Sequence, residues 1–175
     1  TAAVSRQKKD SATVTFETLR MDALAIEIAV AEHVRPIESG LDILDVRCFP
    51  ETENRLVVVK LRPKVEGQSK TACMGALSSP EIGPRLVIAV DDDVDASDLR
   101  DVSWSFASRL HAEYDVAGID GLPATQDGVA EIGAVFKWFV DAAKPPLTQP
   151  EKRAEFDRAT PKNLSSTVLD DFLPD

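Results

Sequence analysis

Residues 85–95 constrain the fold of this chain more than any other part of its sequence. Residues 85–90 read Arg-Leu-Val-Ile-Ala-Val, and such a short apolar run with a polar end is typical of a strand buried on both faces. The next five residues contain four aspartates, Asp91, Asp92, Asp93 and Asp95. The residues that follow favour a helix, with Asp95 or Ser97 as its N-cap. Strand, acidic turn and helix form a βα unit, and open α/β sheets place ligands at the carboxyl ends of their strands.

The rest of the chain shows the same alternation of strand and helix patterns. Apolar runs and period-2 alternation predict strands at residues 41–49, 55–62, 85–90, 115–119 and 134–140. Helical spacing predicts helices at residues 17–33 and 68–78, one of about 13 residues after the acidic turn, and a short one within 150–159. Residues 120–133 hold three glycines and Pro123, which favours a loop.

Two helical stripes are expected to face the core. The first comprises Met21, Leu24, Ile28 and Ala31, widened by Ile26, Val30 and Val34. The second comprises Leu99, Val102, Phe106 and Leu110. The sequence therefore predicts a single α/β domain with a mixed sheet, flanking helices and an extended, proline-containing C-terminal tail. We place a flexible N-terminal arm at residues 1–16, the domain at 17–144 and the tail at 145–175.

Composition excludes several classes of partner. The formal net charge of −10 disfavours nucleic acid and anionic membrane surfaces, which both require a basic face. No apolar run approaches the roughly 20 residues of a membrane span, and residues 1–10 have no signal-peptide core. Cys48 and Cys73 lack a CxxC partner, so we expect buried thiols in a reducing, cytoplasmic compartment.

Two segments resemble the carboxy-terminal domain of UbiD-like decarboxylases. The first, "RLVIAVDDDVDASDLRDVSWSFASRL", has a strand ending in aspartates and a helix with Trp104 and an Ala-Ser-Arg ending at residues 107–109. The second, "KWFVDAAKPP" at residues 137–146, is similar to the family's strand that ends in Asp-Ala-Thr, with Ala143 in place of the threonine. The resemblance covers roughly residues 17–160, with helix, strand, strand and helix in the expected order upstream.

What the resemblance implies is an assembly role rather than a catalytic one. Members of the family bind prenylated FMN, a divalent metal and potassium in another domain, which also carries a catalytic Glu-Arg-Glu set. No residue here matches those sites, so the resemblance assigns no catalytic and no cofactor-binding residue to this chain. It implies a non-catalytic small subunit of a (de)carboxylase acting on an aromatic or unsaturated carboxylic acid. A larger catalytic subunit would carry the cofactors, and this chain would supply assembly surface and one wall of the cleft.

Other interpretations stay open. The chain could be a free-standing homo-oligomeric module that binds a small acid or regulates a partner, or a domain excised from a longer polypeptide. Asp91, Asp93 and Asp95 are weak candidates for binding a hard cation, although caps and turns also explain aspartates here. A haloacid-dehalogenase-type phosphatase would use Asp93 and Asp95 as nucleophile and acid/base, but that motif has threonine where this chain has Ser97.

The histidines and the known motifs add no further site. His33 and His111 have no metal-ligand neighbour at suitable spacing, and GxSxG, GxGxxG and P-loop motifs do not occur. Trp104 and Trp138 are expected in the core or an interface.

The tail carries the predicted interface. Five prolines interrupt residues 145–175, and four apolar residues, Val168, Leu169, Phe172 and Leu173, recur at helical spacing. We expect docking on another chain through Phe156, Leu169, Phe172 and Leu173. The alternative is that the tail folds back over its own sheet.

Overall fold

The computed structural model describes residues 15–37, 40–79, 84–123 and 134–158, which form one mixed sheet with helices on both faces. The strands are β1 (Ile43–Cys48), β2 (Leu56–Leu61), β3 (Leu86–Val90), β4 (Val116–Pro123) and β5 (Ala134–Ala142). Their spatial order is β1-β2-β3-β5-β4. The three central strands are parallel, and both edge strands run antiparallel to their neighbours. The predicted α/β class and mixed sheet are confirmed.

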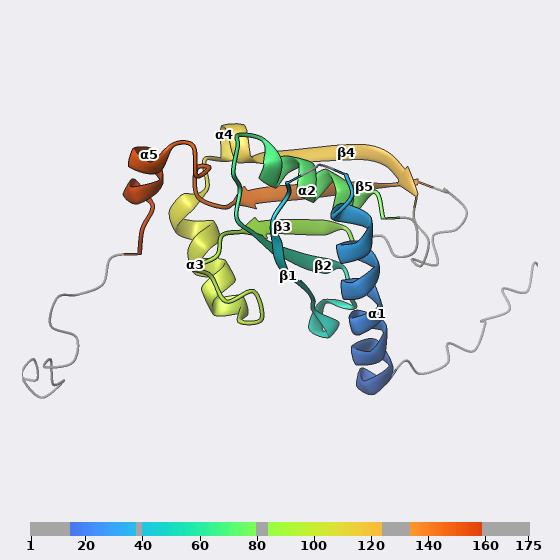
Figure 1. The fold of residues 1–175 in the computed structure, drawn as a ribbon. Coiled ribbons are helices and arrows are strands. Elements are labelled where there is room, and N and C mark those ends of the chain that lie inside the picture. The colour runs from blue at the N-terminus through green and yellow to red at the C-terminus, as the bar shows by residue number, and fades with distance from the viewer. Residues whose placement is uncertain (1–14, 38–39, 80–83, 124–133, 159–175) are drawn as a thin grey trace, which may run out of the picture.

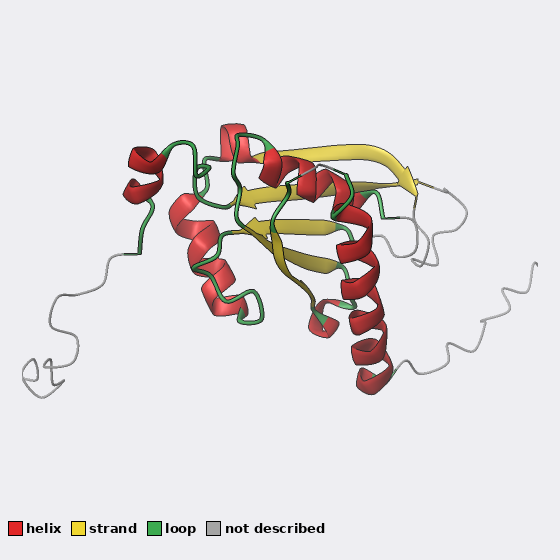
Figure 2. Cartoon of the chain, viewed as in Figure 1, coloured by secondary structure: helices red, strands yellow, loops and turns green. Residues whose placement is uncertain are grey.

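The sheet is the middle of three layers (Figures 1 and 2). Helices α1 (Phe16–Val34) and α2 (Gln68–Leu77) cover one face, and α3 (Leu99–Arg109) covers the other. Both faces of the sheet are apolar because both are covered by helices. In β2, Val57 and Val59 pack under α1 and α2, while Val58 packs toward α3. Successive strand residues point to opposite faces, so a strand covered on both sides reads as a continuous apolar run.

Strand β3 occupies the centre of the sheet, as residues 85–90 predict. Residues 87–90 are all buried. Val87 pairs with Val57 of β2 on one side and with Phe139 of β5 on the other. The aspartate turn therefore leaves the sheet between two parallel neighbours, at the edge where the carboxyl ends of three strands meet.

The predicted core-facing stripe of α1 is confirmed for Ile26, Val30 and Val34 and wrong for Met21, Leu24 and Ile28. The buried residues are Ala23, Ile26, Val30 and Val34. Met21, Leu24 and Ile28 are instead 75%, 58% and 53% exposed. At about 100° per residue the two sets lie on different sides of the helix. A helix at the edge of the layer has only one side against β1 and α2, and the other side remains in solvent.

Helix α3 also departs from its predicted stripe. Val102, Ser105 and Arg109 are its buried residues, whereas Phe106 is exposed. Polar contacts decide which side of α3 is buried. The Ser105 hydroxyl donates to the Ala142 carbonyl at 2.8 Å, and Arg109 pairs with Asp93. The N-cap is Asp98, whose carboxylate accepts the Arg100 N–H, rather than Asp95 or Ser97.

The C-terminal half differs from its prediction in extent. Strand β4 continues to Pro123 because it pairs with β5 beyond a register shift after Ile119, where Gly121 adopts a positive φ of 80°. The rest of the expected loop, 124–133, lies outside the described residues. Three short helical segments complete the described part of the fold: 3-10 helix η1 (Pro50–Thr52), α4 (Ala112–Asp115) and α5 (Pro150–Glu155), the last within the range predicted for it.

Both cysteines are buried and free, as predicted. Cys48 is 5% exposed and Cys73 is fully covered. Burial raises the pKa of the Cys48 thiol to about 12, so it is a packing residue rather than a nucleophile. Within the described part of the chain, no helix is long and apolar enough to cross a membrane.

Candidate functional site

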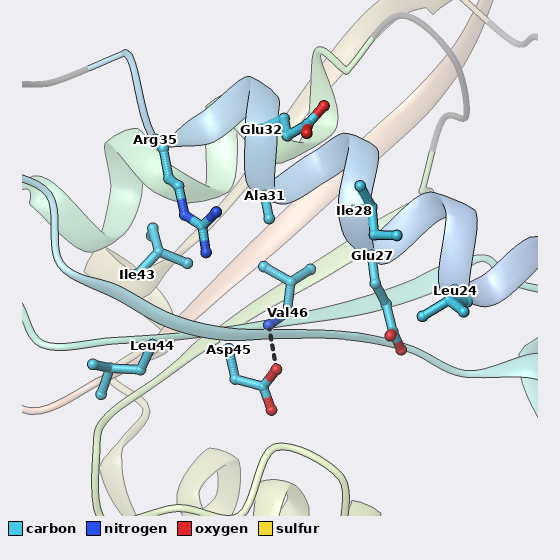
Figure 3. A pocket seen from close by; sticks show the side chains of 10 residues that line it. All are labelled: Leu24, Glu27, Ile28, Ala31, Glu32, Arg35, Ile43, Leu44, Asp45 and Val46. Atoms are coloured by element: carbon cyan, nitrogen blue, oxygen red, sulfur yellow. Dashed lines mark hydrogen bonds between the residues drawn. The ribbon is translucent and has the colours of Figure 1, made fainter.

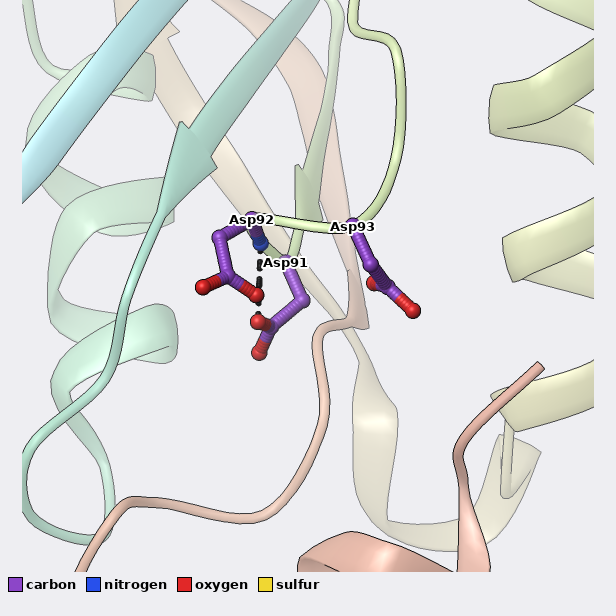
Figure 4. Close-up of side chains that lie close together, drawn as sticks. All are labelled: Asp91, Asp92 and Asp93. Carbon is purple, nitrogen blue, oxygen red and sulfur yellow. Dashed lines mark hydrogen bonds between the residues drawn. The ribbon is translucent and has the colours of Figure 1, made fainter.

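The candidate site lies at the carboxyl edge of the sheet, where Asp91, Asp92 and Asp93 follow β3. Figure 4 shows the side chains of Asp91 and Asp92 close together and that of Asp93 beside them, all three extending from the turn in the same direction. Four cationic side chains from separate parts of the chain meet these carboxylates: Arg62, Arg109, Lys144 and Arg153. We refer to these seven residues as the aspartate clasp.

Asp91 is the buried centre of the clasp, with no exposed surface. The Nη1 and Nη2 groups of Arg153, in α5, both donate to the Asp91 carboxylate, Nη1 at 2.9 Å and Nη2 in a shorter contact. The backbone N–H groups of Asp92 and Lys144 donate to it at 2.8 and 3.1 Å. Arg153 also donates to the Pro145 carbonyl at 2.9 Å, so Asp91 anchors the start of the tail to the sheet.

Asp92 and Asp93 complete the clasp on either side. Asp92 accepts from Arg62 Nε at 2.8 Å. Asp93 accepts two bonds from Arg109, at 3.0 and 2.6 Å, and lies 3.0 Å from Lys144 Nζ. The side chains of Arg109 and Lys144 are only 1% and 7% exposed, so Asp93 supplies the counter-charge that permits their burial.

The environment separates the pKa values of these carboxyls. Burial raises the pKa of Asp91 to about 6. A side-chain hydrogen bond with Asp91, followed by that of Arg62, lowers the pKa of Asp92 to about 2. The pKa of Asp93 is lowered by Arg109 and Lys144, which outweigh the opposing effect of its partial burial. At neutral pH the three aspartates therefore face four cations, and the turn carries no excess of negative charge.

The clasp brings together a different set of aspartates from the predicted metal candidates. Among the described residues, oxygens of Asp91, Asp92 and Asp93 lie within 4.8 Å of one another. Asp95 turns away, and its Oδ1 accepts the N–H and hydroxyl of Ser97 at 2.9 and 2.7 Å. Each carboxylate of the trio already receives hydrogen bonds from guanidinium or ammonium groups. This donor set suits arginine and lysine rather than a divalent ion.

The phosphatase hypothesis fits this geometry poorly. Its nucleophile would be Asp93, which is held by Arg109 and Lys144, and its acid/base Asp95, which closes a turn with Ser97. A nucleophile and its acid/base need to face one reacting atom. Here the two side chains have separate partners.

A pocket of about 460 Å³ adjoins the clasp. One of its polar lining residues is Asp141 of β5, which accepts the Ser69 hydroxyl in a short contact and the Ala143 N–H at 3.2 Å. Burial raises the pKa of this carboxyl. At the rim, Lys70 Nζ donates to the Tyr114 carbonyl at 2.6 Å. Arg109, His111, Lys144 and Phe156 also line the pocket.

Sequence reasoning missed most of the residues that build this edge. Arg109, Asp141 and Lys144 lie within the two segments that carried the family resemblance, which was the available signal. No sequence pattern pointed to Arg62 or Arg153, because they lie about 30 and 60 residues from their aspartate partners in sequence.

The tail begins by contacting its own domain. Leu147 N–H donates to the Pro63 carbonyl at 2.9 Å, and the Phe156 ring meets His111 edge to face at 6.3 Å. Arg109 Nη2 donates to the Phe156 carbonyl at 3.1 Å. The other predicted interface residues, Leu169, Phe172 and Leu173, lie outside the described residues, and their docking stays a prediction.

Comparison with known proteins identifies the family. Residues 21–131 match the model of the 3-octaprenyl-4-hydroxybenzoate carboxy-lyase C-terminal domain. The chain therefore belongs to the UbiD family, in the part that corresponds to the carboxy-terminal domain, and the suspected resemblance is confirmed.

Similar proteins are much longer than this chain. The phenolic acid decarboxylase of Bacillus subtilis is 27% identical over 71% of this chain and 27% of its own length. The anhydromevalonate phosphate decarboxylase of Aeropyrum pernix is 36% identical over 57% of this chain and 23% of its own length. The chain thus spans about a quarter of these relatives.

Solved structures show the same relation. The UbiD-class enzyme HmfF from Pelotomaculum thermopropionicum, solved with FMN, is 27% identical with a TM-score of 0.71, over 90% of this chain and 34% of that chain. The vanillic acid decarboxylase of Sedimentibacter hydroxybenzoicus shares the fold at 22% identity with a TM-score of 0.66, over 85% of this chain and 32% of that chain.

The residues of the carboxyl edge do not fit a bound flavin or its metal. Arg109 and Lys144, which could face a phosphate, are paired with Asp93, Lys144 is also paired with Asp157, and the clasp carboxylates are occupied by cations. We therefore derive no chemical step through prenylated FMN, a divalent metal or potassium in the described part of this chain.

Proposed function

We propose that this chain is the non-catalytic assembly unit of a UbiD-type (de)carboxylase that acts on an aromatic or unsaturated carboxylic acid. The match of residues 21–131 to the carboxy-terminal domain of the family is the observation that carries the proposal. The clasp supports it, because carboxylates that are each paired with a cation are suited to holding structure rather than to proton transfer.

In this proposal a larger catalytic chain holds prenylated FMN, a divalent metal and potassium. The UbiD-class neighbours support the cofactor, since HmfF has been solved with FMN and, in an evolved dimeric form, with prenylated FMN. The vanillic acid decarboxylase neighbour consists of more than one kind of chain, which supports a multi-subunit arrangement. The buried thiols of Cys48 and Cys73 are compatible with a cytoplasmic location.

The clasp would contribute by fixing where the tail leaves the domain. Arg153, held by Asp91, and Phe156, held by Arg109 and His111, keep residues 145–158 against the carboxyl edge. Residues 159–175 would then reach the catalytic chain from a defined point. A preorganised arm loses less conformational freedom on docking than a free one.

Two truncations test this proposal. The untagged full chain, isolated from its native cells, is expected to co-purify with a larger chain that shows flavin absorbance. Ending the chain after Arg158 removes Leu169, Phe172 and Leu173 of the predicted interface but keeps the clasp, so it should retain the melting temperature and lose the partner. Ending it after Lys144 also removes Arg153 and should lower the melting temperature. A full chain that isolates alone, without flavin, would overturn the proposal.

The pocket beside Asp141 supports the alternative of a small-acid-binding module. Its volume of about 460 Å³ and its lysine and histidine rim are suited to a small carboxylate. Calorimetry of the purified chain with 4-hydroxybenzoate tests this. Saturable binding that is lost in Lys70→Ala and kept in the control Lys64→Ala would favour the module, and the assembly unit predicts no binding.

A further inference from the structure

The aspartate clasp has one more cation than it has carboxylates. Arg109 and Lys144 share the single carboxylate of Asp93, whereas the other two cations each have an aspartate of their own. The side chains of Arg109 and Lys144 are only 1% and 7% exposed. Buried cations require counter-charges, so one further anion is needed at this point. Asp157, which follows α5, supplies it, and its Oδ1 accepts from Lys144 Nζ at 2.6 Å.

The charge of Lys144 depends on these two carboxylates. Burial disfavours the ammonium, but its hydrogen bonds to Asp157 and Asp93 outweigh burial and raise the pKa of Lys144. If Asp157 were absent, Arg109 and Lys144 would present two positive charges to the one carboxylate of Asp93. The position that Asp157 occupies is therefore suited to any small group with one negative charge.

Residues 156 and 157 together present the groups of a small carboxylic acid. The Asp157 carboxylate accepts from Lys144, and the Phe156 carbonyl accepts from Arg109 Nη2 at 3.1 Å. The Phe156 ring lines the pocket of about 460 Å³ and meets His111 edge to face. Two oxygens on two buried cations, with a ring beside them, are the contacts that a carboxylate with an apolar body would make.

The segment that supplies these groups is not part of the core. No residue from 147 to 158 is buried, and the Asp157 side chain is 61% exposed. Helix α5 has six residues, too few for a helix that is stable by itself, so its position depends on contacts with the domain. Arg109 and Lys144 both line the adjoining pocket. An external anion could therefore replace Asp157 without disturbing the sheet.

A second pocket shows the opposite charge pattern. It has a volume of about 260 Å³, lies between α1 and β1, and is lined by Glu27, Glu32, Asp45 and Arg35 together with apolar residues (Figure 3). Three carboxylates and one guanidinium disfavour a bound anion there. The excess of buried positive charge is a property of the carboxyl edge.

We propose that Arg109 and Lys144 form a binding site for a small monocarboxylate with an apolar body, and that Asp157 closes this site as an internal substitute for the ligand. The single missing negative charge favours a monocarboxylate over a phosphate dianion. The inference rests on residues of this chain and does not depend on the proposed assembly role. It differs from the small-acid-binding module because its cation is Lys144 rather than Lys70, and because the site is closed in the wild type.

Calorimetric titration of the full chain with benzoate, at constant ionic strength, tests the site. The wild type should give no saturable binding, because Asp157 fills the position. Asp157→Ala should bind benzoate, with a gain in affinity of about tenfold or more. Glu155→Ala is the matched control, since Glu155 is an exposed carboxylate of the same segment and its removal should leave the wild-type behaviour unchanged.

Two double variants identify the cation that holds the ligand. Lys144→Met/Asp157→Ala removes both members of one ion pair, so the chain should fold by circular dichroism and should not bind benzoate. Lys70→Ala/Asp157→Ala should bind as tightly as Asp157→Ala. Binding that is lost with Lys70 and kept without Lys144 would assign the ligand to the rim of the pocket and overturn the inference.

Two further outcomes would overturn it. The first is an Asp157→Ala chain that is folded and binds benzoate no better than the wild type; if this variant does not fold, Asp157→Asn gives the same readout with the size of the side chain kept. The second is binding of inorganic phosphate to Asp157→Ala with the affinity of benzoate. A full chain that isolates without a larger partner would contradict the assembly role and leave these titrations unaffected.

Discussion

The aspartate clasp and the exposed side of α1 place unfavourable groups in opposite ways. In the clasp, seven charged side chains meet within the chain, and the fully buried Asp91 is paired with Arg153. On α1, the large apolar side chains of Met21, Leu24 and Ile28 remain exposed. Ion pairs formed within one chain hold structure, whereas a contiguous exposed apolar surface marks an interaction site.

The largest expected effect breaks the clasp at Arg153. Arg153→Ala leaves the buried Asp91 carboxylate without its guanidinium, which should lower the free energy of unfolding by about 3–5 kcal/mol. Arg62→Ala is the matched control, because its side chain is 42% exposed and its ion pair with Asp92 should contribute about 1 kcal/mol or less. Urea denaturation measures both. Equal losses would show that the clasp is not centred on Asp91.

Two isoleucines on α1 compare its buried and exposed faces. Ile26 is 1% exposed and Ile28 is 53% exposed, two positions apart. Ile26→Ala should lower the free energy of unfolding by about 2–5 kcal/mol through a cavity in the core. Ile28→Ala should change it by less than about 0.5 kcal/mol. A large loss from Ile28→Ala would mean that the exposed side of α1 is covered by another part of the same chain.

Acidification should first raise and then lower the stability of the fold. The pKa of Asp91 is raised to about 6 and that of Asp141 is also raised, so the folded chain takes up protons before the unfolded chain does. Stability should therefore rise by about 1 kcal/mol as pH falls from 7 to 5. Below pH 4 the lowered pKa values of Asp92 and Asp93 reverse the trend.

Urea midpoints measured across this pH range check the prediction. Asp141→Asn removes one of the two raised groups and should reduce the slope between pH 7 and 5. A stability that falls steadily from pH 7 to 5 in the wild type would contradict the assignment of raised pKa values to these two carboxyls.

The smallest expected effect is that of a divalent ion on the clasp. Because the clasp carboxylates already accept hydrogen bonds from cations, added magnesium should leave the melting temperature unchanged. A magnesium-dependent rise that disappears in Asp92→Asn and persists in the control Asp98→Asn would show that an ion displaces the arginines. The metal interpretation would then return.

Much of the fold could be predicted because it depends on local patterns. Residues 85–90 show a buried strand, and the order of strands and helices fits a three-layer α/β domain. The family resemblance lay in short motifs and is confirmed over residues 21–131. Periodicity was less informative where both sides of a helix are apolar. In α1, Leu24 and Ile26 are equally hydrophobic, and only contact with the sheet decides which one is buried.

The sequence by itself determined that four aspartates follow a central strand and that the chain belongs to an α/β class. It did not determine what those aspartates do, since capping, metal binding and catalysis use the same carboxylate chemistry. Only the tertiary structure placed Arg62, Arg109, Lys144 and Arg153 around them. The physical reason is distance along the chain. A carboxylate takes its pKa and its role from charges brought near by folding, and these come from positions that no local pattern connects.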